Sequence, residues 1–323
     1  MMLGSLLLLL PLMATAQIQH VQGPPVHNQS SQPQKQKPPK PNKPTAQKPP
    51  KQNPEFEGLT AEQIGQGAYD YYFGKNGKER NSDKALEWAR QADKMGNNIG
   101  QYVISMDYRD DYGALDKDTV EYVKWLKKAA ENGHPRAQYE LGHLHHVGWY
   151  VKKDYAEAAR WYRKPAEQGD EDAQCGLGQL YNGMLTTDYA EAFKWFRMAA
   201  DQGDLYSLFK VADFYYEGKG VPQDYAEAIK IWTKRSSHYE SQFKLGDCYY
   251  YGHGVKQDYA EAVKWYRKSA AQKIARAQWR LATCYYYGHG VEKNLDEAKS
   301  LLRMAAEKGD KVAKQRLKEW FGE

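Results

Sequence analysis

Two Ser-x-x-Lys strings are the parts of this chain best suited to nucleophilic chemistry: Ser207 to Lys210, and Ser241 to Lys244. In enzymes that attack β-lactams, such a string pairs a serine nucleophile with a lysine that can serve as its base. Those enzymes also need S-D-N and K-T-G strings, and the sequence contains neither. Both serines occupy a position that is Ala in the other copies of a repeated pattern. We therefore interpret both serines as structural. A hydrolase that acts on β-lactam or cell-wall substrates is kept as an alternative to a non-catalytic protein.

Histidines gather at His143, His145 and His146. A zinc site needs about four ligands that converge on one point. Neighbouring residues on a helix point about 100° apart, so this cluster does not converge. We expect no metal site, no cofactor and no catalytic residue.

Two other residue types recur at equivalent positions. Cys248 and Cys284 stand where other copies carry Leu or Phe, which predicts small buried side chains. A disulfide between them stays open as an alternative, because an exported protein would meet oxidising conditions. His253 and His289 recur in a Gly-His-Gly turn where other copies have Lys or Trp. This variation predicts a solvated loop position.

The elements that carry these residues repeat about every 36 residues. The phrase D-Y-A-E-A begins at Asp154, Asp188, Asp224 and Asp258, with a weaker echo from Leu295. A period of this size indicates stacked units of secondary structure, each unable to bury its apolar face alone.

Each unit contains two helical patterns joined by a glycine turn. In the first, clearest over Ala277–Tyr287, a small residue is followed by an aliphatic residue at +4, a second small residue at +5 and an aromatic residue at +8. These spacings place the large side chains on one helical stripe. The Asp of D-Y-A-E-A predicts an N-cap for the second helix. A Trp seven residues after that Asp, as in Trp161, Trp195 and Trp265, is expected to fill the space between helices.

The combined pattern, A-x-x-x-L-G-x-x-Y-x-x-G-x-G-V-x-x-D-Y-x-x-A-x-x-W, resembles the Sel-1-like repeat, a relative of the tetratricopeptide repeat. The resemblance implies an all-α fold, a right-handed α-solenoid of about seven helix-turn-helix repeats over residues 58–309, closed by a capping helix over 310–323. Two units near 62–97 and 98–133 are degenerate and are expected to lack a clean first helix. The family also implies a scaffold for protein partners, often in bacterial envelopes or at host contact.

In the related tetratricopeptide arrays the first helices line the concave face. Carried over, this places positions +2, +6 and +9 of each first helix in a groove suited to an extended peptide. An alternative is that the +2 aromatic residues pack between helices, whereas the +9 tyrosines are expected to be exposed. The predicted partner-binding residues are Tyr139, Phe209, Phe243 and Trp279 at +2, His143, Asp213 and Asp247 at +6, and His146, Tyr216, Tyr250 and Tyr286 at +9.

The N-terminal region differs from the repeats. An apolar run from Leu6 to Met13 ends in Ala14-Thr15-Ala16, which predicts a signal peptide over 1–16, cleaved after Ala16. Residues 17–57 hold ten of the fourteen prolines and six lysines, and predict a disordered basic linker. We expect a secreted or periplasmic protein with no membrane attachment after cleavage.

Charge separates the same two regions. The net charge is +5, and the linker alone contributes six lysines, so residues 55–323 carry −1. A near-neutral repeat region gives no electrostatic support for binding nucleic acid. The basic linker allows contact with an anionic cell-wall polymer. The sequence therefore predicts an exported scaffold for a protein or peptide partner, with a wall-associated structural protein as a further alternative.

Overall fold

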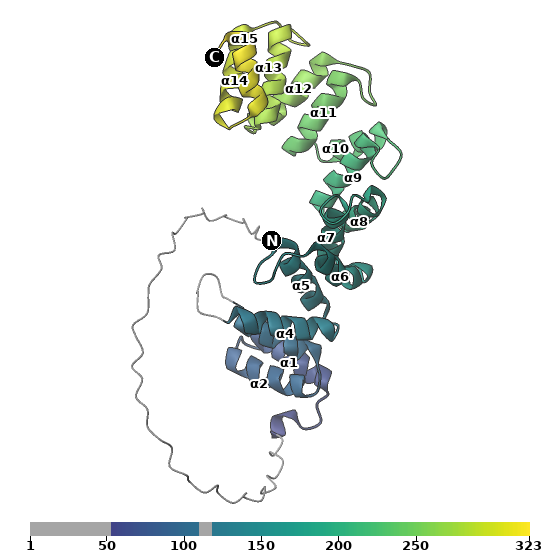
Figure 1. Ribbon diagram of the computed structural model, residues 1–323, viewed down its shortest axis with the longest axis vertical. Coiled ribbons are helices and arrows are strands. Elements are labelled where there is room, and N and C mark those ends of the chain that lie inside the picture. Colours follow the sequence, from purple (N-terminus) through teal and green to yellow (C-terminus); the bar gives the residue numbers. More distant parts are fainter. Residues whose placement is uncertain (1–52, 110–117) are drawn as a thin grey trace, which may run out of the picture. The chain divides into compact units, whose positions relative to one another are not determined.

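The computed structural model describes residues 53–109 and 118–323, so the predicted signal peptide and nearly all of the linker lie outside the described residues. Within those residues the chain forms seven helix–turn–helix pairs and a closing helix (Figure 1). The first helices are α1 (Ala61–Phe73), α3 (Asn98–Tyr108), α5 (Pro135–Val147), α7 (Glu171–Tyr181), α9 (Leu205–Glu217), α11 (Tyr239–Tyr251) and α13 (Ala275–Tyr287). The second helices are α2 (Ser82–Lys94), α4 (Thr119–Glu131), α6 (Tyr155–Glu167), α8 (Tyr189–Gln202), α10 (Tyr225–Lys234), α12 (Tyr259–Ala271) and α14 (Leu295–Glu307). The closing helix is α15 (Lys311–Phe321).

Polar caps and glycines set the ends of these helices. The Asp that opens each D-Y-A-E-A phrase is the N-cap of a second helix, and its carboxylate accepts a hydrogen bond from the backbone N–H three residues later. Asn294 does the same for α14. Five first helices end at a glycine in the left-handed conformation: Gly74, Gly148, Gly218, Gly252 and Gly288. The predicted turns and caps are therefore present.

An aromatic ring eight residues after the capping Asp fills the space inside each of the four pairs that carry the D-Y-A-E-A phrase. Tyr162, Phe196, Trp232 and Tyr266 are almost fully buried at this position. The facing residue on the first helix is small because it touches the ring, and a Cβ added to Gly178 would lie 2.6 Å from Phe196. The prediction that the Trp at +7 plays this part is only partly right. Trp195 is buried, but Trp161 and Trp265 are half-buried at the edge of the pair.

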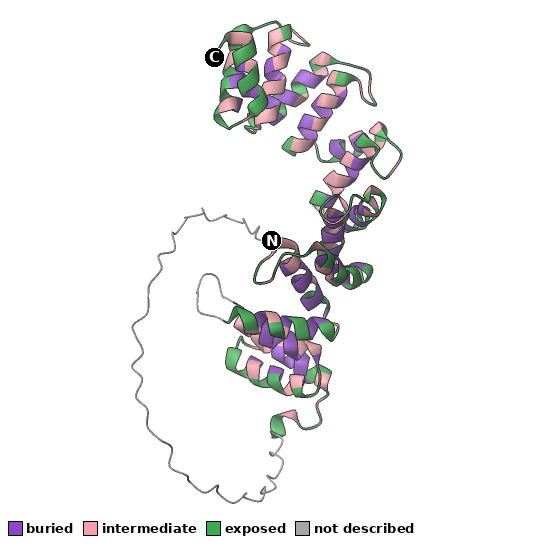
Figure 2. Cartoon of the chain, in the orientation of Figure 1, coloured by how far each residue is buried: buried purple, intermediate pink, exposed green. Residues whose placement is uncertain are grey.

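Among the described residues, buried side chains form five clusters, each shared by a few consecutive helices. Figure 2 shows buried residues along the helices from the first pairs to the last. Each helix packs on the next one in chain order, and the few longer-range contacts join successive first helices, such as α5 with α7 and α7 with α9. The predicted all-α solenoid of about seven repeats is confirmed.

The N-terminal units differ from their prediction. Both first helices expected to be irregular are complete, as α1 spans 13 residues and α3 spans 11. The predicted linker reached residue 57, yet Pro54–Phe56 forms a 3-10 helix. The ring of Phe56 packs edge-on against Trp88, with centroids 5.3 Å apart. The repeat region therefore begins a few residues earlier than the linker composition indicates.

The closing helix α15 covers the last pair. Ala313 and Leu317 are buried, while Lys311, Lys314 and Lys318 are exposed. An end of a solenoid needs such a helix, because its inner face replaces the next repeat and its outer face meets water.

Candidate binding surface

The predicted +6 carboxylates are already paired with the neighbouring repeat. Asp213 Oδ1 lies 2.8 Å from Lys244 Nζ, and Asp247 Oδ1 lies 3.2 Å from Arg280 Nε. Tyr266 Oη also donates a hydrogen bond to Asp247, at 2.6 Å. Burial raises the pKa of Asp247, and the Arg280 charge opposes that rise. These carboxylates hold successive first helices together, so they are not free to bind a partner as an open polar floor.

The +9 tyrosines are half-buried, and two of the three are hydrogen-bonded to the next repeat. Tyr216 Oη lies 2.6 Å from His253 Nδ1, and Tyr250 Oη lies 2.9 Å from His289 Nδ1. The prediction that the two histidines occupy a solvated loop position is wrong. Each ring is held by a hydrogen bond and by stacking, so it joins two repeats.

The stacking partners come from both repeats. His253 lies on the ring of Tyr225, with centroids 5.1 Å apart and planes 9° from parallel. His289 lies on Tyr259 at 4.6 Å and 14°. The outer face of each histidine is covered by a tyrosine of its own repeat, at 5.5 Å in both cases. We define the tyrosine–histidine ladder as Tyr216, Tyr225, Tyr250, Tyr251, His253, Tyr259, Tyr287 and His289.

The +2 aromatic residues pack at the junctions between helices, as the alternative interpretation expected. Phe243 is 7% exposed, so its predicted place in an open groove is wrong. The Arg276 guanidinium lies over the Phe243 ring, 4.7 Å from its centroid. Three others are half-buried beside a polar side chain: Tyr139 under Arg136, Phe209 against His238, and Trp279 under Arg280.

The other predicted residues have local partners too. His146 Nδ1 lies 3.3 Å from Tyr162 Oη, and burial lowers the pKa of both His143 and His146. Tyr286 stacks on Trp320 of α15, with centroids 3.9 Å apart. Much of the surface of the predicted residues is therefore used to join helices and repeats.

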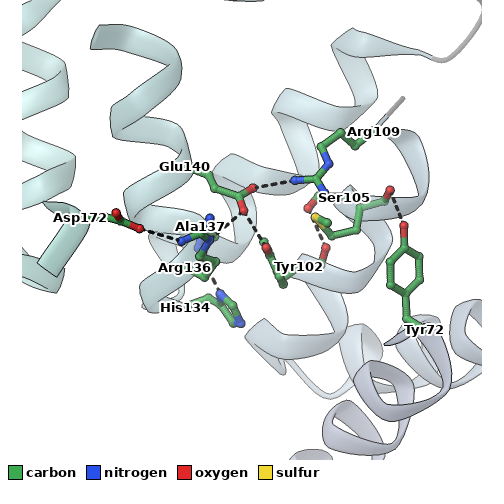
Figure 3. A network of polar contacts seen from close by, with 10 residues as sticks. Tyr72, Tyr102, Ser105, Arg109, His134, Arg136, Ala137, Glu140 and Asp172 are labelled. Carbon is green, nitrogen blue, oxygen red and sulfur yellow. Dashed lines mark hydrogen bonds and ion pairs between the residues drawn. The ribbon is translucent and has the colours of Figure 1, made fainter. Parts of the chain in front are cut away.

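A polar cluster that the sequence analysis missed lies between α3 and α5 (Figure 3). Glu140 is at its centre, with its side chain 10% exposed. Glu140 Oε1 accepts hydrogen bonds from Tyr102 Oη at 2.8 Å and from Arg136 Nε at 3.1 Å. Arg109 Nη1 lies 3.7 Å from Glu140 Oε2, and Arg136 Nη1 lies 3.4 Å from Asp172 Oδ2.

This cluster forms one side of a cleft of about 500 Å³. The other side is apolar and aromatic, formed mainly by Tyr69, Phe73, Ile99 and Met106. His134 stacks on Tyr102 at 4.3 Å, and burial lowers the pKa of His134 to about 4. The cleft therefore combines charged groups with an apolar wall, over three successive first helices.

The candidate nucleophiles are inaccessible. Ser207 and Ser241 are 0% exposed, so neither hydroxyl can reach a substrate. Cys248 and Cys284 are free thiols in the core, and burial raises the pKa of each to about 12. No group of three or more metal-ligating side chains that could hold an ion is found in residues 53–109 and 118–323.

The sequence profile of the Sel1 repeat matches this chain seven times. The matched segments are residues 64–97, 101–134, 135–170, 171–204, 205–234, 240–273 and 275–310. The chain belongs to the Sel1 repeat family. Proteins of this family are generally scaffolds for protein–protein interaction, and they are generally not catalytic.

Solved structures of Sel1 repeat proteins are similar to this chain. A protective antigen present in uropathogenic Escherichia coli strains is 33% identical, with a TM-score of 0.61, over 79% of this chain and 55% of that one. A Sel1 repeat protein from Oxalobacter formigenes is 27% identical, with a TM-score of 0.53, over 81% and 77%. The chain thus spans about half of the first of these proteins.

A short curated match extends beyond bacteria. An F-box protein of Arabidopsis thaliana is 36% identical over 70 residues, which cover 22% of this chain and 19% of that protein. The chain thus spans about a fifth of the length of that relative.

The weak form of the pattern in the first repeats explains why the sequence analysis did not predict the cleft. Its residues belong to the repeats at 64–97, 101–134 and 135–170, and the first two carry the weakest form of the pattern. One signal was available. Arg109 and Glu140 are 31 residues apart, and so are Asp213 and Lys244, which form the same kind of inter-repeat pair.

Proposed function

We propose that this Sel1 repeat protein is an exported scaffold that binds a partner protein or an extended peptide along the face formed by its first helices. The observation that carries the proposal is the tyrosine–histidine ladder. Its outer rings, Tyr251 and Tyr287, are 43% and 52% exposed and occupy the same position in two successive repeats. Tyrosine is enriched among the side chains that contribute most to protein interfaces.

The ladder is ordered before any partner arrives. Tyr251 packs on both Tyr250 and His253, and Tyr287 packs on both Tyr286 and His289. A side chain that is already fixed loses little rotamer entropy on binding, which otherwise opposes association by about 0.5–1.5 kcal/mol for each side chain. The ladder therefore offers repeated apolar contact area at low entropic cost.

Photo-crosslinking tests this proposal directly. A photoreactive phenylalanine analogue replaces Tyr251 in one variant and Met304 in a control. Met304 is 40% exposed but lies on the second helix α14. We expect a defined crosslinked product in the native host from position 251 and none from position 304. The same crosslinked products from both positions, or no product from position 251, would rule out partner binding on the face formed by the first helices.

A double variant separates binding from folding. We expect Tyr251→Ser with Tyr287→Ser to abolish that interaction while leaving the circular dichroism spectrum unchanged, because neither side chain is buried. The matched control replaces the exposed second-helix residues Met198 and Met304 with Ser. Loss of binding in the control pair alone would contradict the proposal.

Export is the second part of the proposal, and the N-terminal sequence supports it. The apolar run from Leu6 to Met13 and the Ala14-Thr15-Ala16 site have the form of a cleaved signal. No helix among residues 53–109 and 118–323 is both long and apolar enough to span a bilayer. N-terminal sequencing of the protein from its host should begin at Gln17. Recovery of the intact chain from the cytosol would contradict export.

The basic segment also supports contact with an anionic cell-wall polymer, because it carries six lysines between residues 17 and 54. We expect a variant lacking residues 17–54 to be released from isolated cell walls by lower salt than the full chain. Equal retention of both forms would remove this part of the proposal.

A further inference from the structure

We propose that the tyrosine–histidine ladder binds a proline-rich segment of a second copy of this chain, residues 37–45, so that copies join head to tail. This proposal deepens the scaffold function, on which it rests, because it names a partner for the surface around Tyr251 and Tyr287.

The first observation is a tripeptide pattern in the N-terminal segment. Residues 37–45 read K-P-P, K-P-N and K-P-T, so a proline recurs at every third residue: Pro38, Pro41 and Pro44. These residues lie outside the described ranges. A polyproline II helix has three residues per turn. Bound in that conformation, the segment would present its prolines on one face and its lysines on another, one third of a turn away.

The second observation is a pair of exposed rings at the ends of α11 and α13. Tyr251 and Tyr287 are the last residues of these helices, and stacking on His253 and His289 fixes both rings. Neither phenol hydroxyl is hydrogen-bonded within residues 53–109 and 118–323. Proline-rich helices bind to surfaces lined by aromatic side chains. Their backbone carbonyls have no internal hydrogen bonds, so each hydroxyl can donate to one of them.

The spacing of the two rings matches one turn of the segment. Asp247 on α11 pairs with Arg280 on α13 at 3.2 Å, so these helices are neighbours. The axes of neighbouring helices lie about 8–10 Å apart, and the two tyrosines occupy equivalent positions. One turn of polyproline II advances about 9 Å. Successive prolines of the segment can therefore contact successive rings.

The charges at the ladder permit a basic partner. The Arg280 guanidinium lies 5.3 Å from the centroid of Tyr251, but its charge is balanced by Asp247. The lysines of the segment would lie on a different face from the prolines and remain in water. The repeat region as a whole carries a net charge of −1, so it does not repel the six lysines of the N-terminal segment.

The reach of the segment favours a second copy. Its prolines lie 9–15 residues before Asn53, which is hydrogen-bonded to Glu87 of α2 at 2.9 Å. An extended tether of that length spans about 28–47 Å. Five successive first-helix steps separate α1 from α11, or about 50 Å along the stack at 10 Å for each step. We therefore expect the segment of one copy to occupy the ladder of another.

This contact joins two different surfaces, so each added copy leaves one segment and one ladder unoccupied. Association of this kind continues into open chains instead of stopping at a dimer. The test is sedimentation equilibrium of the full chain purified from its host. We expect the mean mass to rise with protein concentration. An excess of a peptide of residues 36–46 should restore the monomer mass, whereas a peptide of the same composition without proline at every third position should not.

Variants assign the association to the pattern. We expect Pro41→Ala, with the same change at Pro38 and Pro44, to weaken association about tenfold or more, because the ring contacts and the preformed conformation are both lost. The matched control replaces three prolines outside the pattern by alanine: Pro24, Pro25 and Pro33. We expect this control to associate like the parent chain.

Mixing two variants separates binding between copies from loss of folding. The variant with Tyr251→Ser and Tyr287→Ser keeps its segment, and the variant without the three prolines of the pattern keeps its ladder. Each should remain a monomer alone. Their equimolar mixture should form a dimer with one copy of each, because only one junction is possible.

Three results would overturn the proposal: a constant monomer mass up to about 100 μM, equal weakening by the two sets of proline changes, or no dimer in the mixture. None of them tests whether the ladder binds another protein. If crosslinking at position 251 yields a defined product with a different protein, the scaffold function stands and only the identity of the partner is wrong.

Discussion

The turn before α14 contains two glycines that should respond very differently to the same substitution. Gly288 and Gly290 both have a left-handed backbone, with φ of +77° and +68°. A Cβ on Gly288 would lie 3.5 Å from its nearest neighbour, Lys293, which is ordinary contact. A Cβ on Gly290 would lie 2.2 Å from the backbone carbonyl carbon and oxygen of Tyr259, in the preceding repeat.

The difference sets the expected magnitudes. Both alanine variants lose about 1–2 kcal/mol of stability, because an L-residue is disfavoured in the left-handed region. Gly290→Ala must also push the turn away from Tyr259, and overpacking of this kind adds about 1–3 kcal/mol. We therefore expect Gly290→Ala to be more destabilising than Gly288→Ala by about that additional amount.

The measurement is a urea titration followed by circular dichroism, with hydrogen exchange to locate the change. Repeat arrays unfold in parts, so the effect should appear first in the amides of α13 and α14. Equal destabilisation by the two variants would refute the reasoning, because it would mean that the second glycine is needed only for its backbone angle. So would a greater loss from Gly288→Ala.

Three further predictions concern single side chains. Burial lowers the pKa of His134 to about 4, so the unfolded chain binds more protons between pH 6.5 and 4, and stability should fall by up to about 3 kcal/mol as the pH drops through that window. Urea titrations at pH 7 and 4.5 measure this loss. The His134→Asn variant keeps a side chain that can cap the helix, and its free energy of unfolding should change less between the two pH values. The same loss in the variant as in the parent protein would show that His134 is not its source. Phe243→Ala should reduce the free energy of unfolding by about 3–5 kcal/mol, whereas Tyr251→Ala should change it by less than about 0.5 kcal/mol; similar values would mean that Phe243 is not buried. Ser241→Ala should leave stability unchanged or slightly raised, because the Ser241 hydroxyl is buried without a hydrogen-bond partner among the described residues, and a large loss in a thermal melt would argue against this.

The helices of this protein follow directly from its sequence. The Asp154 and Asp258 caps and the Gly252 turn act on the backbone within a few residues, so a local pattern is enough to predict them. The period then predicts the stack, because a helix pair with an apolar face has only its neighbours to bury it against.

The side-chain pairs between repeats were not predicted, because they depend on how far one helix pair is rotated on the next. Tyr216 bonds to His253, 37 residues later, only because that rotation places the turn that contains His253 beside the first helix of the preceding repeat. The covariation was nevertheless visible within the single chain. A tyrosine at +9 is followed twice by a histidine in the next turn, at His253 and His289. Where the turn carries Lys219 instead, its Nζ lies 5.4 Å from the ring centroid of Tyr189.

The ladder bears on how the number of repeats can change over evolution. Its bonds run from one unit to the next at the same offset, since His253 and His289 are 36 residues apart and contact equivalent tyrosines. Removal of residues 253–288 would join Gly252 to His289 and present Tyr216 and Tyr225 with a chemically identical imidazole. Duplication of the same segment would add another such junction. Gene rearrangement could therefore lengthen or shorten the array in whole units without requiring a new interface between repeats.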